Sequence, residues 1–435
     1  MEKAPEQEPP QPQPPPAATG DRVLLVVTGY GSSKQSIALA DVQRDYCSGT
    51  IEVDAAARAA ADARFGCSAP KVLASLDDFL PRGKNALAIT DLDHVSARWR
   101  ALDVDGDSFF ARPAEYPLIL DRGADFAPHL AHFIMTGVTA ITRATGAACD
   151  EHGIDWLTEN LRAEFEHADY VHVSNEVSIV DDCKYPVKGT YTFCSKERDF
   201  KALLDVHVNV VELTGNHNRD FGDAPFKTTI EWYRAHDIAT FGGGLTPEGA
   251  NVPAVLALKD GKKLGIAGFN ESCPLHECAK KPGEVGANFY SADKAKAVIA
   301  KLRGELGADF VIVTVQFRER DGTDPTPSQN KIAHDLVDWG ADLVYGSQGH
   351  EPQLVEFYKG KPIFFGIGNF LFDQIHRTPV RQGFFLHHYY FAGRLVQSVP
   401  VFTFMAATRQ PTLATPEQAD AVRAAIFRDA LLYSK

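Results

Sequence analysis

Five short apolar runs, each rich in β-branched or aromatic residues, end directly in polar side chains that suit a binding or catalytic site. Segments of helical composition separate several of these runs, and such alternation is typical of a sheet covered by helices on both faces. In these folds ligands bind at the loops that follow the carboxyl ends of the strands. The sequence therefore predicts an α/β protein with one polar site at a sheet edge. The runs occupy residues 171–173, 210–213, 311–315, 343–346 and 364–367.

The polar residues after these runs are the candidate site. Histidine and carboxylate side chains act as general acids, bases and metal ligands, and amides donate hydrogen bonds to anions. A single residue of this kind after a strand is more often a turn or cap residue, but five such ends are hard to explain as capping. The remaining alternative is a polar core in which the amides satisfy one another. The candidate catalytic residues are Glu176, His217, Asp220 and His350, and the candidate substrate-binding residues are Asn216, Gln316, Arg318, Gln348 and Asn369.

Several motifs resemble, in order and spacing, those of the poly-γ-glutamate capsule-synthesis (CapA-type) proteins, distant relatives of calcineurin-like metallophosphoesterases. The resemblance implies metallophosphoesterase-like layered sheets covered by helices. It also implies a function connected with an anionic polymer of the cell envelope. The motifs are HVSNE at 172–176, ELTGNHNRD at 212–220, FGGG at 241–244, GADLVYGSQGH at 340–350 and GNFLFD at 368–373.

Three positions depart from the pattern of that family. Val138 stands where the family has an aspartate after its first strand, and Gln316 and Gln348 stand where it has histidines. Amide oxygens bind transition metals poorly, and two cations close together need more negative charge than remains here. We therefore expect at most one divalent cation, of unknown identity, or a metal-free site based on His217 and Glu176. The expected ligands are Glu176, Asn216, His217 and His350.

Composition divides the chain into three parts. Residues 1–20 are rich in proline and glutamine and predict a disordered tether, residues 21–125 a small α/β accessory domain, and residues 126–435 the CapA-type domain. The tether lacks the basic and apolar segments of a signal peptide. We expect an exported, periplasmic or cell-surface protein in which Met1 replaces a lipoprotein signal, so that a lipid anchor is its contact with the membrane. The alternative is a cytosolic protein with a disordered end.

The cysteines agree with export. Of the 7 cysteines, six form pairs that are close in sequence, which predicts the disulfides 47–67, 183–194 and 273–278 and leaves Cys149 free. Zinc binding is an alternative, but CxxC doublets are absent from the sequence. Buried free thiols are a third possibility.

The net charge of −13 argues against nucleic acid and anionic membranes as general partners. The expected partner is an anionic polymer, such as poly-γ-glutamate, or a phosphorylated small molecule held in a local pocket. The surviving acid–base residues favour a hydrolase that acts on such a substrate. The loss of family ligands favours the alternative, a catalytically decayed binding or scaffolding component of an envelope or capsule assembly.

Overall fold

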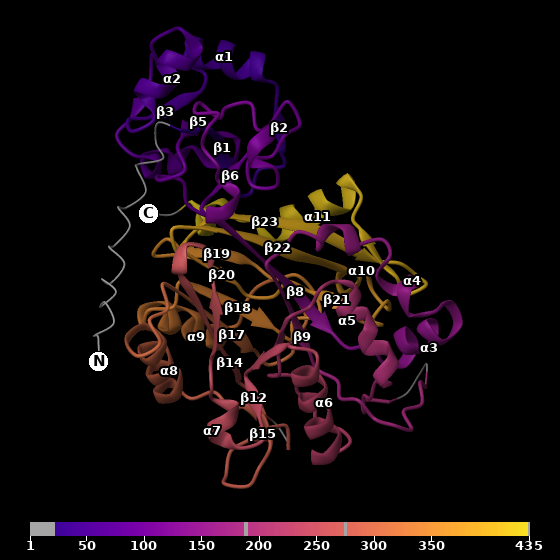
Figure 1. The fold of residues 1–435 in the computed structure, drawn as a ribbon. Helices are drawn as coiled ribbons and strands as arrows, with labels where there is room; N and C mark the ends of the chain where they lie inside the picture. The colour runs from indigo at the N-terminus through magenta and orange to yellow at the C-terminus, as the bar shows by residue number, and fades with distance from the viewer. Residues whose placement is uncertain (1–21, 187–189, 274–275, 434–435) are drawn as a thin grey trace, which may run out of the picture.

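The structure is a computed structural model of the chain, and it describes residues 22–186, 190–273 and 276–433. The predicted tether, residues 1–20, lies outside the described residues. The main body contains two large β-sheets packed face to face, with helices on the outer face of each (Figure 1). This arrangement confirms the predicted α/β fold with layered sheets.

The first sheet has eight strands in the order β11-β10-β9-β8-β22-β23-β24, and β21 pairs with β8. Strands β8 to β11 run parallel, whereas β22, β23 and β24 continue the sheet in antiparallel fashion. The strands are β8 (Leu130–Thr139), β9 (Tyr170–Asn175), β10 (Val210–Glu212), β11 (Ala239–Phe241), β21 (Asn369–Leu371), β22 (Gln382–Phe391), β23 (Arg394–Met405) and β24 (Pro411–Leu413).

The second sheet has six strands in the order β13-β14-β17-β18-β20-β19. Its four central strands are parallel, and the two edge strands are antiparallel to their neighbours. The strands are β13 (Ala254–Ala257), β14 (Lys263–Asn270), β17 (Phe310–Gln316), β18 (Leu343–Ser347), β19 (Val355–Tyr358) and β20 (Lys361–Phe364).

The apolar side chains of each central strand are divided between two cores. In β8, Phe133 and Met135 belong to the core between the two sheets, whereas Ile134 packs under the outer helices. This follows from the two-residue period of a strand, which sends successive side chains to opposite faces. Helices α3 (Arg143–His152), α4 (Ile154–Thr158), α5 (Lys201–Asp205) and α6 (Asp223–Ala235) cover the first sheet, and α8 (Ala292–Gly304) and α9 (Pro327–Asp338) cover the second.

A separate five-stranded sheet of order β4-β3-β5-β1-β6, here called the N-terminal sheet, stands beside β22 and β23 (Figure 1). It is tied to the body by the Ala101 N–H, which donates to Gln397 Oε1 at 3.0 Å, and by the Gly31 N–H, which donates to the Tyr433 hydroxyl at 2.9 Å. Its elements are β1 (Leu25–Gly29), α1 (Leu39–Ser48), β3 (Glu52–Asp54), α2 (Arg58–Phe65), β4 (Val72–Leu73), β5 (Leu87–Thr90) and β6 (Trp99–Ala101).

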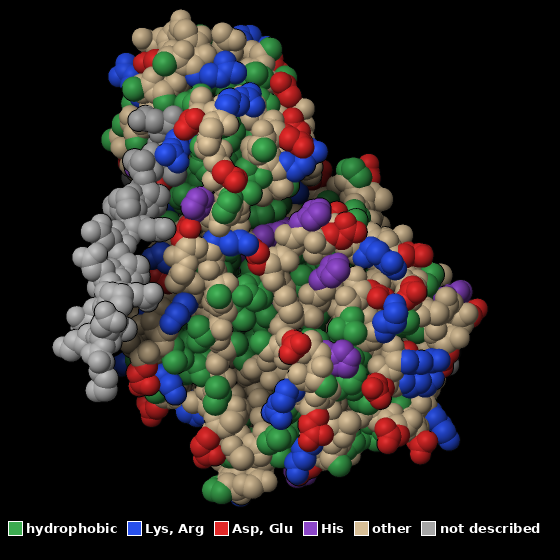
Figure 2. Space-filling model, viewed as in Figure 1, with side chains coloured by type: hydrophobic (Ala, Val, Ile, Leu, Met, Phe, Trp, Pro, Cys, Tyr) green, Lys and Arg blue, Asp and Glu red, His purple; other side chains and the backbone are tan. Residues whose placement is uncertain are grey.

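The remaining elements, apart from α11, are short. The helices are α7 (Pro247–Ala250), α10 (Thr378–Arg381), α11 (Pro416–Ile426) and α12 (Asp429–Leu432), and the strands are β2 (Ser36–Ile37), β7 (Asp103–Val104), β12 (Gly243–Gly244), β15 (Cys278–Ala279) and β16 (Gly286–Asn288). Within the described part of the chain, no helix is both long and apolar enough to cross a bilayer. Acidic and basic side chains are interspersed on the face shown in Figure 2, without an extended basic patch.

Candidate functional site

Most of the predicted site residues lie at or just after the carboxyl ends of parallel strands in both sheets, whereas Asn369 begins β21. Glu176 follows β9, His217 follows β10, and His350 follows β18. The loop after β10 packs closely against Glu176. It can do so because residue 215 is glycine, since a Cβ atom at this position would lie 2.6 Å from the Glu176 Cα. Glycine at this position therefore allows His217 to come close to the carboxyl group of Glu176.

His217 is fixed by its neighbours on two sides. Its Nδ1 donates to Asp220 Oδ2 over 2.8 Å, and the same oxygen accepts the Phe193 N–H at 2.7 Å. The ring stacks on Phe193 with the centroids 3.8 Å apart. Burial lowers the pKa of His217, but the Asp220 hydrogen bond and the Glu176 charge outweigh it and raise the pKa above its ordinary value. Since Nδ1 is the donor, Nε2 is left as the basic nitrogen of the neutral ring.

His350 is anchored in the same way by an amide. Its Nδ1 lies 2.8 Å from Asn369 Oδ1, and Asn369 Nδ2 donates to the Val380 carbonyl at 3.0 Å. The second bond fixes the amide orientation, so Oδ1 is the acceptor and Nδ1 of His350 carries the hydrogen. Nε2 of His350 lies 3.6 Å from the Glu319 carboxylate, which is largely exposed. The ring is nearly parallel to Phe372, with centroids 5.1 Å apart.

Glu176 is the buried acid of the site. Its side chain is 2% exposed, and among the described residues its Oε1 has no hydrogen-bond partner. Burial raises the pKa of Glu176 above its ordinary value, although the charges of His217 and His350 pull it down. A buried carboxyl with a raised pKa beside two imidazoles is a pattern typical of acid–base sites.

The candidate substrate-binding amides contact one another. Gln316 Nε2 donates to Asn216 Oδ1 at 2.8 Å and also to Gln348 Oε1, and Gln316 Oε1 accepts from the Thr214 hydroxyl at 3.4 Å. The structure thus brings these three amides together beside the site, but they hydrogen-bond one another. Arg318 stands apart, since it is exposed and its backbone N–H donates to Glu271 at 3.1 Å.

The predicted metal ligands were tested against this geometry. Within the described ranges, no three His, Cys, Asp or Glu side chains are placed to hold a metal ion together. The orphaned Glu176 Oε1 suits a cation, but Asn216 Oδ1 is already occupied by the Gln316 amide. The set Glu176, Asn216, His217 and His350 therefore does not form a metal centre in this arrangement.

Sequence reasoning missed the two phenylalanines that hold the imidazoles. The Arg143 guanidinium lies over both rings, with its Cζ 4.3 Å from the Phe193 centroid and 5.2 Å from that of Phe372. Arg143 Nε donates to Asp373 Oδ2 at 3.0 Å, and its φ of 44° is rare for a residue other than glycine. The position of Phe193 beside Cys194 is the only signal in the sequence that could have indicated its role.

All three predicted disulfides are present, namely Cys47–Cys67, Cys183–Cys194 and Cys273–Cys278. Cys149 is free, as predicted, and it is buried. The Cys183–Cys194 bridge closes the loop that carries Phe193, so it restrains a segment in contact with His217.

These features define a layered α/β protein with a buried acid–base cluster at the ends of its parallel strands. Residues 132–374, more than half of the chain, match the family described as Bacterial capsule synthesis protein PGA_cap. The chain belongs to this family.

Curated relatives share about a quarter of the matched residues. The Capsule biosynthesis protein CapA of Bacillus anthracis is 27% identical over 248 residues, which cover 55% of this chain and 59% of the relative. The PGA biosynthesis protein CapA of Bacillus subtilis (strain 168) is 26% identical over 229 residues, covering 52% and 59% respectively. The chain thus matches less than two thirds of the length of either relative.

Two solved structures show a distant likeness. An NAD nucleotidase from Haemophilus influenzae has a TM-score of 0.39 at 12% identity, covering 67% of this chain and 61% of that chain. A putative 5'-nucleotidase from Staphylococcus aureus has a TM-score of 0.40 at 9% identity, covering 68% and 57%. Similarity of this extent says nothing about activity.

Proposed function

We propose that the protein takes part in the synthesis or processing of an anionic capsule polymer of the poly-γ-glutamate type. Membership of a family described by capsule synthesis supports the process, and the B. subtilis relative named as a PGA biosynthesis protein supports the polymer. Within that process, we propose that the protein hydrolyses the polymer, with Glu176, His217 and His350 as the reacting cluster. An anionic phosphorylated substrate is the second class that this cluster suits.

The observation that carries the proposal is the buried Glu176 carboxyl, whose charge interacts with the anchored His217 imidazole. Water attacks the amide carbonyl of the polymer while His217 Nε2 accepts a proton from it, and the Asp220 hydrogen bond stabilises the resulting imidazolium. Glu176, whose raised pKa keeps it protonated to a higher pH, gives its proton to the leaving nitrogen as the C–N bond breaks. The protons balance, because the His217 imidazolium returns its proton to the Glu176 carboxylate after product release.

The test incubates the full chain with purified γ-glutamyl oligomers and follows their length by mass spectrometry. Wild-type protein should shorten them, and Glu176→Gln or His217→Ala should lose roughly 10²-fold or more of the rate. His236→Ala removes an exposed imidazole at the end of α6 and serves as the control. If wild-type protein leaves the oligomers intact with or without added divalent cations, hydrolysis of this polymer is excluded.

A binding or scaffolding role is the second candidate, favoured by the self-satisfied amides Asn216, Gln316 and Gln348. In that case the oligomers should bind without change in length. Metal analysis of protein purified without chelator adds a further test, in which we expect no more than one equivalent of divalent cation. Two equivalents per chain would restore a two-metal phosphoesterase mechanism.

We also propose that the protein is exported, to the periplasm or cell surface, and held there by a lipid anchor. The three disulfides support this location, because such bonds persist in oxidising compartments. Fractionation of cells that express the natural gene, with thiol labelling of the recovered protein, tests it. Recovery in the cytosol with reactive Cys183 and Cys194 would contradict export.

A further inference from the structure

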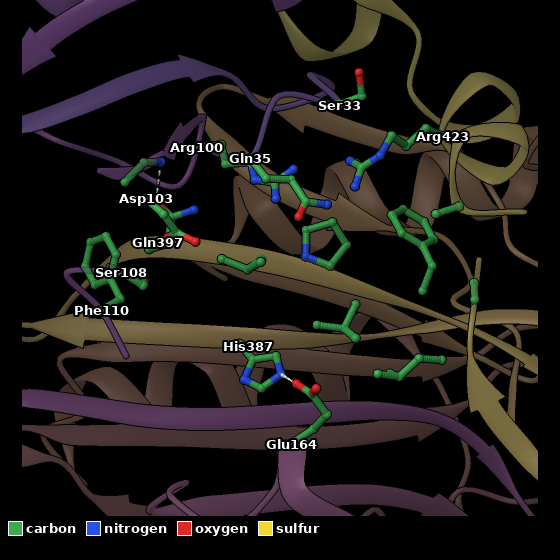
Figure 3. Close-up of a pocket in the computed structure, with 18 of the residues that line it drawn as sticks. Ser33, Gln35, Arg100, Asp103, Ser108, Phe110, Glu164, His387, Gln397 and Arg423 are labelled. Carbon is green, nitrogen blue, oxygen red and sulfur yellow. Dashed lines mark hydrogen bonds and ion pairs between the residues drawn. The ribbon is translucent and has the colours of Figure 1, made fainter. Parts of the chain in front are cut away.

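A cavity of about 750 Å³ lies between the N-terminal sheet and the β22–β23 hairpin. Its lining comes from β6, from the two strands of the hairpin and from α11, and none of the candidate site residues belongs to it. Figure 3 shows Gln35 and Arg423 on one side of the cavity and the His387–Glu164 pair on the other. The volume is typical of a small-molecule site.

Two buried arginines from different elements line the cavity. Arg100 on β6 and Arg423 on α11 are each 7% exposed. Their Nη1 atoms donate to the same acceptor, the Ser32 carbonyl oxygen, at 3.2 Å and 3.3 Å. Burial, with the neighbouring charge of Arg423, lowers the pKa of Arg100 to about 10. Two positive charges thus share one neutral acceptor inside the protein.

The acidic groups around the cavity do not pair fully with these charges. Asp420 Oδ1 lies 3.7 Å from Arg423 Nε, but its side chain is 63% exposed. Asp103 lines the cavity and interacts with Arg100 through space, yet among the described residues no carboxylate is within 4.0 Å of the Arg100 guanidinium. Glu164 lies at the other side of the cavity, 3.8 Å from His387, which burial keeps neutral. A buried charge without a close counter-charge is costly, so an anion between the two guanidinium groups would be stabilising.

The wall beside the arginines is apolar. It is formed by aliphatic and aromatic residues of the hairpin and its neighbour β24, and the Arg423 guanidinium lies 4.8 Å over the Phe402 ring. These residues are Val399, Pro400, Val401, Phe402 and Leu413. A phosphate surrounded by water would leave this wall unused, whereas an aliphatic chain would cover it.

We propose that this cavity binds a carboxylate on an aliphatic stem, with the carboxylate paired to Arg100 and Arg423 and the stem along the Val399–Phe402 wall. The inference is independent of the proposed function, because it shares no residue with the acid–base cluster. A ligand here would contact both the N-terminal sheet and the body, so its binding should also stabilise their packing.

Titration calorimetry of the full chain with hexanoate, hexanol and inorganic phosphate tests the site. Hexanoate should bind once per chain, at least tenfold more tightly than hexanol or phosphate, and Arg423→Gln should weaken it at least tenfold. The control Arg428→Gln, which removes an exposed arginine paired with Asp324 at 2.6 Å, should bind as wild type. Phosphate binding as tight as hexanoate, or hexanoate binding that survives Arg423→Gln, would overturn the proposal.

A second pair of variants covers the case in which Arg423→Gln does not fold. Ala419 lines the cavity one helical turn before Arg423 on α11, so Ala419→Glu places a carboxylate in the cavity beside that arginine. This variant should fold, with an unchanged or raised Tm, and should lose hexanoate binding. Ala421→Glu, at an exposed position of the same helix, should keep it. Equal hexanoate binding by the two variants would contradict the assignment.

Discussion

Each imidazole of the acid–base cluster is held by a hydrogen bond at Nδ1 and by an aromatic ring. His217 has Asp220 and Phe193, and His350 has Asn369 and Phe372. Arg143 lies over both phenylalanines, so one guanidinium supports the rings that orient both histidines. Groups fixed in this way need little reorganisation when a proton moves, which is the structural requirement for efficient acid–base catalysis.

The Asp220 hydrogen bond predicts a specific shift at His217. Replacing the charged acceptor, as in Asp220→Asn, should lower the pKa of His217, because burial then acts with less opposition. Titration of the imidazole resonances by NMR measures the change. Asp223→Asn removes a half-exposed carboxylate that pairs with Arg219, and it should leave the His217 titration as in wild type. An unaltered midpoint in Asp220→Asn would show that the hydrogen bond does not control the proton on His217.

Gly215 predicts a steric effect at the same place. In Gly215→Ala the new methyl group meets the Glu176 backbone at 2.6 Å, so we expect a loss of about 1–3 kcal/mol in the free energy of unfolding. The matched change Gly304→Ala, at the end of α8 with open space around it, should be neutral or stabilising by about 0.5–1 kcal/mol. Chemical denaturation of both variants gives the comparison, and equal stabilities would contradict the close contact.

At the scale of elements, the sequence predicted four of the five strand ends because their signal is local. The run 364–367 is the exception, since β20 ends at Phe364 and Asn369 begins β21. The Val210–Leu213 run followed by Gly215 and His217 can be recognised without any knowledge of the fold. Contacts made by distant segments carry no such signal: the Arg143 pair with Asp373 spans 230 residues, and Phe193 reaches His217 from a separate loop.

Local composition gives the wrong secondary structure where strand pairing decides the conformation. The alanine-rich segment 53–65 has the composition of a helix, but it forms β3 and then α2, because Val53 pairs with both β4 and β5. Tertiary context overrides local preference in this segment.

The disulfide loop next to the site gives a prediction about one element. Removing the bridge in Cys183→Ser/Cys194→Ser should cost about 2–4 kcal/mol of stability, since the closed loop of 11 residues gains conformational freedom in the unfolded chain. It should also speed hydrogen–deuterium exchange at the Phe193 amide, which donates to Asp220. Cys47→Ser/Cys67→Ser, which removes the bridge between α1 and the segment after α2, is the control and should leave that exchange rate unchanged. Equal exchange in both variants would argue against a link between bridge and site.

At the scale of the whole molecule, strands β8 and β22 carry three histidines that packing largely removes from water. His132 Nε2 lies 2.9 Å from His387 Nδ1 on one face of the sheet, and His388 faces the core between the sheets near Phe364. Burial lowers the pKa of His132 to about 4 and those of His387 and His388 to about 3. These side chains are therefore neutral in the folded protein over the range in which an unfolded chain protonates them.

This difference in protonation predicts that the free energy of unfolding decreases as the pH falls. Between pH 3 and the ordinary histidine value near 6.5, the unfolded chain binds more protons at His388 than the folded protein does, so stability falls as pH falls. One such group contributes a slope of up to about 1.4 kcal/mol per pH unit. Glu176 and His217, with raised pKa values, act in the opposite direction, but they are common to wild type and variant.

His388→Leu isolates one group, since both of its ring nitrogens lack hydrogen-bond partners among the described residues and an apolar side chain can replace the ring. Urea denaturation from pH 4 to 6.5 should show a shallower loss of stability in His388→Leu than in wild type, while the exposed control His236→Leu should follow wild type. Parallel curves for wild type and His388→Leu would mean that this histidine is not kept neutral by burial.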